Sequence, residues 1–326
     1  MKTLSLGLYL FLAMIITGIT ACGNKSTLVT PEASPDSIQT VVGFSQIGDE
    51  SEWRSANTVS IQNEAKRLNI TLKFSDAQQK QENQIKAIRS FIAQRVDLIG
   101  VSPVVETGWE SVFREAKIAG IPIIVVDRRA DVPEDLYVTQ LGSDFLEEGR
   151  RAGREMVKLL KGKGKIVELV GTVDSAPAND RYKGFREILK DYPDMVIIDS
   201  ASGDFTRSLG REVMETFLQK YGSEIHALYA HNDDMATGAI EAIEKYGLKP
   251  GKDIKIVSID AARGAFKAMI AGKLNVTIEC NPLLGPKFFE LAQKVLKGED
   301  VPKRVYSEEG IFYPDNAAEI LPTRQY

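Results

Sequence analysis

The feature that most constrains this chain is a series of short apolar runs without polar alternation. Strands with one wet face alternate apolar and polar residues, whereas parallel strands covered by helices on both faces are apolar throughout. Ile123 to Val126 is a run of this kind, and segments with helical spacing of apolar residues separate the runs. The sequence therefore predicts an α/β fold built on doubly wound parallel sheets.

The alternation of strands and helices begins after residue 39. The strands expected in the first half are Val41–Ser45, Ile70–Phe74, Asp97–Val101 and Ile121–Val126, and the helices are Ser51–Leu68, Gln81–Gln94 and Gly108–Ala119. Gly120 and Pro122 end the last of these helices, because glycine is favoured just past a helix and proline cannot continue it.

The same order of elements then starts again. The strands expected in the second half are Lys165–Val170, Met195–Asp199, Ala227–Ala230 and Ile254–Ile259, and the helices are Asn179–Asp191, Ser208–Tyr221, Asp233–Tyr246 and Arg263–Ala271. From Leu274 onward we expect a strand, a helix at Pro286–Leu296 and a short terminal strand, a segment able to cross back between lobes. The repetition indicates two similar lobes.

Residues 1–22 indicate export and a lipid anchor. Lys2 precedes an apolar stretch, Leu4–Ile16, that is shorter than the ~20 residues of a membrane span. An ordinary signal peptide would end in an Ala-x-Ala-like site, but here small residues lead directly to Cys22. This arrangement resembles a bacterial lipobox, which implies cleavage before Cys22 and a lipid on that cysteine. Residues 23–39, rich in Ser, Thr and Pro, are expected to form a flexible tether.

Charge and cysteine content limit the partners of the exported part. The whole chain carries a net charge of −4, and loss of Lys2 with the leader leaves −5, so we expect no binding to nucleic acid. Beyond Cys22 the sequence holds one further cysteine, Cys280, so no intramolecular disulfide forms once Cys22 is lipidated. We expect a monomer without a cofactor, associated with the membrane only through its lipid.

Motifs of the common enzyme classes are absent from the sequence. It contains no G-x-G-x-x-G, no G-x-x-x-x-G-K-[ST] and no G-x-S-x-G. His226 and His231, the two histidines, are an odd number of residues apart and would face opposite sides of a strand, so we predict no metal site. We therefore predict no catalytic residues, although carboxylate-only glycosidase chemistry stays open at this point.

Polar residues gather where the predicted strands end. Ligands of open parallel sheets bind beyond the carboxyl ends of the strands. The residues in such positions are Asp127, Arg128, Arg181, Asn232 and Asp260. Each alone has an ordinary structural alternative, and Asn232 in particular is a good helix cap. Together they form an array of forked donors and acceptors that suits the vicinal hydroxyls of a sugar.

Sugars also present apolar faces that aromatic rings cover. Trp53 follows the first strand among charged residues, and we predict that it stacks on the ligand. Trp109 begins a helix, and we expect it in the core.

Several longer segments carry a specific resemblance. They are Gly43–Arg54, Ala77–Gln94, Val101–Glu110, Ser202–Phe217 and Tyr229–Ile243. They resemble the galactofuranose-binding proteins of bacterial ABC sugar importers, a branch of the ribose/galactose type of periplasmic solute-binding proteins, from Val41 to about Asp315. The resemblance implies a periplasmic-binding-protein type I fold, with two Rossmann-like lobes joined by three crossovers near Gly142, Glu279–Asn281 and Gly310.

The resemblance also implies domains, a site and a role. The lobes would comprise 40–142 with 281–310, and 143–280 with 311–326. The implied ligand residues are Glu50, Ser51, Trp53, Arg54, Asp127 and Arg128 from the first lobe, and Arg181, Asn232 and Asp260 from the second. The chain would capture a monosaccharide by hinge closure and deliver it to an ABC transporter permease; the alternative is a periplasmic sensor for a chemoreceptor or histidine kinase. A repressor with the same lobes would need an N-terminal helix-turn-helix, where this chain has an export signal. The ribose branch usually has Gln near Cys280, so the identity of the sugar stays open.

Overall fold

The computed structural model describes residues 39–326. The predicted signal peptide, Cys22 and nearly all of the predicted tether lie outside the described residues. Within 39–326 no helix has the length and apolar character needed to cross a membrane.

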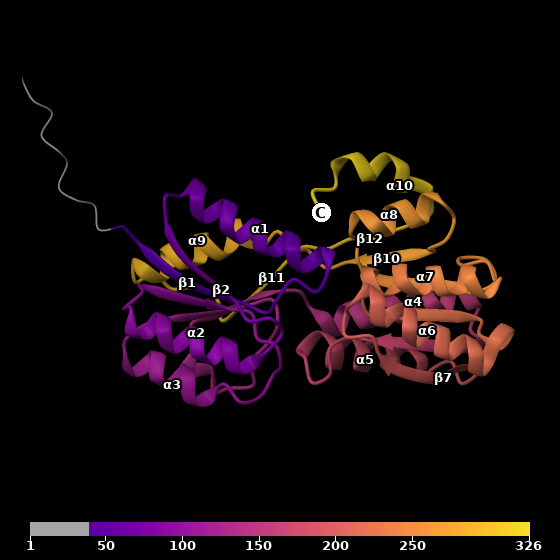
Figure 1. Ribbon diagram of the computed structural model, residues 1–326, viewed down its shortest axis with the longest axis horizontal. Helices are drawn as coiled ribbons and strands as arrows, with labels where there is room; N and C mark the ends of the chain where they lie inside the picture. The colour runs from indigo at the N-terminus through magenta and orange to yellow at the C-terminus, as the bar shows by residue number, and fades with distance from the viewer. Residues whose placement is uncertain (1–38) are drawn as a thin grey trace, which may run out of the picture. The chain divides into compact units, whose positions relative to one another are not determined.

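The first sheet has six strands in the order β11-β5-β4-β3-β1-β2, and every pair in it is parallel. Its strands are β1 (Val41–Gln46), β2 (Thr71–Asp76), β3 (Leu98–Val101), β4 (Ile123–Val126), β5 (Thr139–Gly142) and β11 (Arg304–Tyr306). The helices are α1 (Glu52–Arg67), α2 (Gln81–Ala93), α3 (Glu110–Ile118) and α9 (Gly285–Leu296). Helices α1 and α9 lie on one side of the sheet and α2 and α3 on the other (Figure 1).

The second sheet repeats this order as β12-β10-β9-β8-β6-β7. Its strands are β6 (Gly164–Val170), β7 (Met195–Ser202), β8 (Ala227–Ala230), β9 (Lys255–Asp260), β10 (Val276–Glu279) and β12 (Ile311–Phe312), of which β12 is antiparallel to β10. The helices are α4 (Phe145–Leu160), α5 (Ala176–Leu189), α6 (Arg207–Tyr221), α7 (Asp233–Tyr246), α8 (Arg263–Ile270) and α10 (Pro314–Ile320). Short 3-10 helices at Glu134–Leu136, Gly222–Glu224 and Leu321–Thr323 complete the described elements.

The chain passes between the two lobes at three places. It leaves the first sheet after β5, returns after β10 to form α9 and β11, and leaves again between β11 and β12. This is the predicted fold class, two doubly wound lobes joined by three crossovers. The expectation that the segment after Leu274 crosses back is confirmed, although two short strands, β11 and β12, follow α9 instead of one, and α10 and a 3-10 helix follow them.

Both faces of the central strands are buried, as the apolar runs predicted, whereas the edge strands β2, β7, β11 and β12 are only partly buried. On β8, Tyr229 packs with the α4–α5 side while its neighbour Leu228 packs with α6, α7 and α8. Tyr229 stacks on Phe185 of α5 with ring centroids 4.1 Å apart. The predicted burial of Trp109 is confirmed, because its side chain is fully inaccessible.

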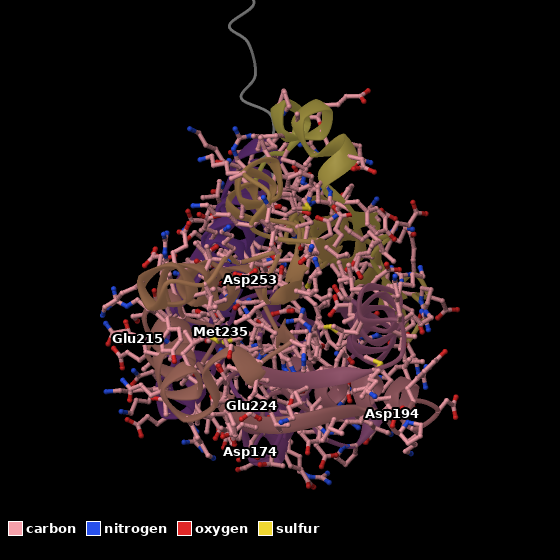
Figure 2. The ribbon with its side chains drawn as sticks, turned by 90° about the vertical axis from the view of Figure 1, so that its right-hand side faces the viewer. Asp174, Asp194, Glu215, Glu224, Met235 and Asp253 are labelled. Atoms are coloured by element: carbon pink, nitrogen blue, oxygen red, sulfur yellow. The ribbon has the colours of Figure 1, made fainter. Side chains whose placement is uncertain are left out.

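Many charged residues lie on the outside of the second lobe. Asp194 and Asp253 are exposed in turns and Glu224 is exposed at the end of a 3-10 helix, whereas Met235 is buried between helices (Figure 2). This distribution leaves the interior of the lobe to apolar packing and to the polar groups that are paired there.

The sequence-based prediction missed helix α4 and strand β5. Two glycines, Gly149 and Gly153, lie within α4 and count against a helix by propensity. Their role is tertiary: a Cβ on Gly149 would lie 2.4 Å from the backbone oxygen of Arg181 in α5. Helix α5 also begins earlier than predicted, because Ser175 caps it and Pro177 occupies its first turn.

Candidate functional site

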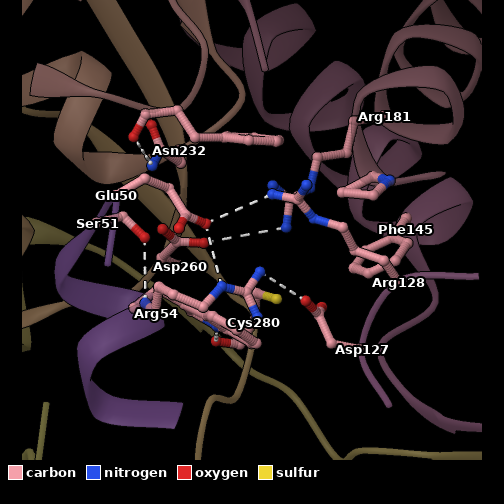
Figure 3. Close-up of a pocket in the computed structure, with 13 residues that line it drawn as sticks. Glu50, Ser51, Arg54, Asp127, Arg128, Phe145, Arg181, Asn232, Asp260 and Cys280 are labelled. Atoms are coloured by element: carbon pink, nitrogen blue, oxygen red, sulfur yellow. Dashed lines mark hydrogen bonds and ion pairs between the residues drawn. The ribbon is translucent and has the colours of Figure 1, made fainter. Parts of the chain in front are cut away.

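A cavity lies between the two lobes, and its volume, which includes space open to solvent, is about 300 Å³. Every predicted ligand residue lines it: Glu50, Ser51, Trp53, Arg54, Asp127, Arg128, Arg181, Asn232 and Asp260 (Figure 3). Phe145, Pro177, Phe205 and Cys280 also line it, and sequence reasoning did not place them there. Contact of these residues with a ligand remains a prediction.

Two aspartates at strand ends adopt unusual backbone conformations. Asp127 follows β4 with φ of 61°, and Asp260 ends β9 with φ of 130°, followed by Ala261 at 59°. Positive φ is uncommon for residues with a Cβ, and such strain concentrates at functional sites. Surrounding hydrogen bonds hold it: Ala261 N–H donates to Thr277 Oγ1 at 3.0 Å, and Ala262 N–H to Asp233 Oδ2 at 2.8 Å. Hydrogen bonds from neighbouring residues therefore hold the turn after Asp260 in its unusual backbone conformation.

Arg54 organises the charges of the first lobe. Ser51 caps α1 by accepting a hydrogen bond from Arg54 N–H at 3.1 Å, so Trp53 and Arg54 sit in the first helical turn rather than in a loop. The Arg54 guanidinium is 2.8 Å from Asp127 Oδ2 and 3.1 Å from Glu50 Oε1. Arg128, the neighbour of Asp127 in the sequence, is not its ion-pair partner. That partner is Arg54, and Arg128 donates to Val104 O at 3.0 Å.

Arg181 organises the charges of the second lobe. Its Nε donates to Glu148 Oε2 at 2.7 Å, its Nη1 donates to His231 O at 2.6 Å, and its Nη2 is 3.9 Å from Asp260 Oδ1. Glu148 escaped prediction because it lies in the helix that propensity argued against.

Asn232 serves the structure directly. Its Oδ1 accepts from Met235 N–H at 3.0 Å, which caps α7, and its Nδ2 donates to Phe205 O at 3.0 Å. Asn232 therefore caps the helix, as its sequence position suggested, and it also lines the cavity.

Two polar atoms of the lining side chains are buried without a hydrogen-bond partner among residues 39–326. They are Glu50 Oε2, an acceptor, and Arg128 Nε, a donor. Leaving such groups unpaired costs about 1–3 kcal/mol each.

Burial and neighbouring charges shift the pKa values of the charged groups that line the cavity. Burial raises the pKa of Glu50, but Arg54 and Arg128 outweigh it and hold the pKa below its ordinary value. Burial raises the pKa of Asp260 well above its ordinary value; Arg181 opposes this, and Asp233 and Asp234 add to it. Burial, with the charge of Arg54, lowers the pKa of Arg128 to about 10. The pKa values of these two carboxyl groups are therefore shifted in opposite directions.

Aromatic rings form the apolar part of the cavity wall. Trp53 is nearly inaccessible, and its Nε1 donates to Cys280 O at 2.7 Å, which fixes the ring. Phe205 lies beneath two cations, with Arg128 at 5.2 Å and Arg181 at 5.8 Å from its ring centroid. Phe145 and Phe205 look like core residues in the sequence, and no local signal distinguishes them.

Direct contacts between the lobes surround the cavity. Glu52 N–H donates to Asp234 Oδ2 at 2.8 Å, and Glu106 N–H donates to Asp174 O at 3.0 Å. Arg129 of the first lobe forms an ion pair with Asp180 of the second at 2.6 Å. A ligand in the cavity would be enclosed by both lobes.

Three side chains near the cavity carry atoms of the kinds that bind metal ions. Oxygen or sulfur atoms of Glu148, Cys280 and Glu309 all lie within 4.8 Å of one another. Glu148 is already paired with Arg181, whose positive charge would face any cation bound there. Ser143 and Asn281 N–H also contact Glu309, so the group connects the crossovers.

Two doubly wound lobes with a polar and aromatic cavity at their facing strand ends define a solute-binding protein of the periplasmic type I class. The model of the periplasmic binding protein domain matches residues 42–300. The chain belongs to this family.

Relatives of known character extend over nearly the whole chain. It is 45% identical over 317 residues to the galactofuranose-binding protein YtfQ of Escherichia coli (strain K12), covering 96% of this chain and 97% of the relative. It is 30% identical to the fructose import binding protein FruE of Bifidobacterium longum (strain NCC 2705), covering 96% of each. These relatives are binding proteins rather than enzymes.

A solved structure agrees in fold and in class. The periplasmic binding protein component of the arabinose ABC transporter from Shewanella sp. ANA-3, bound to α- and β-L-arabinofuranose, superposes with a TM-score of 0.86. It is 47% identical in sequence, and the match covers 88% of this chain and 96% of that one. The predicted resemblance to the galactofuranose-binding branch is thereby confirmed.

Proposed function

We propose that this protein captures a neutral monosaccharide, with a furanose favoured, by closure of its two lobes and delivers it to the permease of an ABC importer. The observation that carries this proposal is the cavity between the lobes, whose lining combines charged and amide side chains with aromatic rings. A sugar has hydroxyl groups for the former and apolar C–H faces for the latter.

Charge balance favours a neutral ligand. Three acids of the lining, Glu50, Asp127 and Asp260, stand against three arginines, Arg54, Arg128 and Arg181. The arginines are already engaged with carboxylates, so an anionic ligand would meet acidic groups at short range in a water-poor site.

Similarity to furanose-binding proteins supports the choice of ring form. The Shewanella relative is described with bound arabinofuranose, and the E. coli relative is a galactofuranose-binding protein. Binding energy from contacts to both lobes would favour the closed state, which a permease would recognise. The sensor alternative is not favoured by these relatives.

Calorimetric competition at fixed ionic strength tests the proposal. We expect methyl galactofuranoside or arabinose to bind more tightly than methyl galactopyranoside, and galacturonate to bind weakly or not at all. Tight binding of galacturonate without binding of neutral sugars would contradict the charge argument. Preference for the locked pyranoside would contradict only the furanose assignment. Release of products from an oligosaccharide would reveal an enzyme instead.

We extend the proposal to a lipid anchor on Cys22, which would hold the protein beside a membrane on its extracytoplasmic side. Support comes from the lipobox-like residues that precede this cysteine. Wild-type protein expressed in a bacterium should partition into detergent, and Cys22→Ser should remain unprocessed at this site. Fully soluble wild-type protein cleaved elsewhere would refute the anchor and leave the sugar-binding proposal intact.

A further inference from the structure

Arg324, which lies outside the cavity, bonds two segments that each carry a cavity residue. Its Nη2 donates to Ala261 O at 2.9 Å, and its Nη1 donates to Glu279 Oε1 at 2.7 Å. Ala261 follows Asp260, and Glu279 precedes Cys280, and both of these neighbours line the cavity. One guanidinium therefore spans the Asp260–Ala261 turn and the second crossover.

Glu279 extends the connection to the third crossover. Its Oε2 accepts from Gly310 N–H at 2.9 Å, while Glu279 N–H donates to Gly310 O at 2.9 Å. Tyr326 closes the group, because its hydroxyl donates to Glu279 Oε1 at 2.8 Å and accepts from Arg324. We call Glu279, Arg324 and Tyr326 the brace.

The brace differs from an ordinary surface ion pair. The side chains of Arg324 and Glu279 are only 10% and 13% exposed. The Arg324 guanidinium also lies 4.3 Å from the ring centroid of Tyr326 and 5.1 Å from that of Phe312. The two aromatic neighbours and the forked hydrogen bonds to Glu279 and Ala261 fix the direction of the guanidinium, which an ammonium group would not reproduce.

The two segments held by Arg324 need support for different reasons. The Asp260–Ala261 turn has two successive residues at positive φ. Cys280 O accepts the Trp53 Nε1 hydrogen bond from the first lobe, and Cys280 N–H donates to Asp260 O at 3.3 Å. A shift of either segment would move an acid of the cavity wall or the ring predicted to stack on the ligand.

We propose that Arg324, with Glu279 and Tyr326, is a positioning residue that sets ligand affinity from outside the cavity by holding Asp260 and Cys280 in place. This inference rests on the proposed sugar-binding function. A merely structural ion pair would change the unfolding temperature without changing the affinity of folded protein. A positioning residue changes affinity and local backbone protection together.

The test measures two quantities on Arg324→Ala, Arg324→Lys and Tyr326→Phe. The first is the dissociation constant of the neutral sugar that wild-type protein binds best. The second is amide hydrogen exchange of Ala261 and Cys280 in ligand-free protein. We expect Arg324→Ala to weaken binding at least tenfold and to accelerate exchange at both amides. Arg324→Lys should weaken binding several-fold, because one ammonium group cannot reproduce the forked hydrogen bonds of a guanidinium. Tyr326→Phe should weaken binding about two- to fivefold.

Arg150→Ala is the matched control. It removes an ion pair of the same lobe, Arg150 with Glu187 at 2.8 Å, that contacts no cavity residue. It should leave affinity and exchange at Ala261 and Cys280 unchanged. Should Arg324→Ala fail to fold, Arg324→Lys and Tyr326→Phe decide the question.

Wild-type affinity and wild-type exchange in Arg324→Lys and Tyr326→Phe would overturn the inference. Failure of wild-type protein to bind any neutral sugar would instead defeat the proposed function. Because exchange is measured without ligand, the two failures are distinguishable.

Discussion

At the scale of single residues, the strand-end aspartates combine strain with charge. Asp127 holds a positive φ while its carboxylate pairs with Arg54 across 73 positions of sequence. Backbone strain at such a position persists only where the surroundings impose it. Asp127 N–H donates to Leu141 O at 2.7 Å, so the edge of the next strand supplies part of that constraint.

Replacing Asp127 by alanine should weaken sugar binding at least tenfold. A charge-assisted hydrogen bond contributes about 1.5–3 kcal/mol, and its loss leaves Arg54 without its shortest ion-pair partner. Calorimetry on folded Asp127→Ala measures the effect. Asp131→Ala, an exposed aspartate a few residues further on, should bind like wild type. Equal affinities for the two variants would place the ligand elsewhere.

At the scale of elements, close packing of helices α4 and α5 aligns the arginine of the second lobe. A Cβ on Gly184 of α5 would lie 2.1 Å from the backbone oxygen of Leu146 in α4. Arg181 is almost one turn earlier in α5, and it pairs with Glu148 of α4. The separation of these helices therefore sets the geometry of the ion pair as well as the core.

Gly184→Ala should destabilise the protein by about 1–3 kcal/mol and weaken sugar binding. The gain of about 1 kcal/mol in helix propensity is smaller than the cost of separating two backbones. Urea denaturation and calorimetry measure the two effects. Lys183→Ala changes the adjacent, exposed position and should alter neither quantity. A Gly184→Ala protein more stable than wild type would show that the helices can separate freely.

At the scale of the whole molecule, Glu309 connects all three crossovers. It contacts the Ser143 hydroxyl of the first, accepts from Asn281 N–H of the second at 3.2 Å, and accepts from Ser307 Oγ of its own segment at 3.2 Å. Burial, followed by the charge of Glu148, raises the pKa of Glu309 to about 8. The folded protein therefore holds a proton there that the unfolded chain releases near the ordinary value of 4.5.

This proton makes the stability contribution of Glu309 depend on pH. Since the folded pKa is the higher one, the contribution is fully present below pH 4.5 and is lost as pH rises to about 8. Glu309→Gln, which is neutral at every pH, should remove this part of the dependence. Urea denaturation of both proteins between pH 5 and 9 should show wild type losing stability relative to Glu309→Gln as pH rises. Parallel curves would mean that Glu309 is ionised in the folded protein at neutral pH.

The sequence alone determined the layered α/β architecture and the positions of most strands and helices. It did so because burial of both faces of a parallel strand requires an apolar run, and Ile123 to Val126 shows this locally. It also predicted the cavity-lining aspartates, since strands with a common direction place their ends at one edge. The resemblance added Glu50 and Ser51, which no periodicity indicates.

Only the tertiary structure decided which charges pair and which unremarkable residues join the site. The pairing of Asp127 with Arg54, and not with Arg128, depends on where the first turn of α1 meets the end of β4. Phe205 and Cys280 enter the cavity wall because the lobes and crossovers bring them there. Periodicity and propensity report a residue's neighbours along the chain, whereas these contacts join segments brought together only by packing of the lobes. Helix α4 could not be predicted for the same reason. Its glycines lower the local helix propensity, but the close approach of α5 leaves no room for a side chain at Gly149.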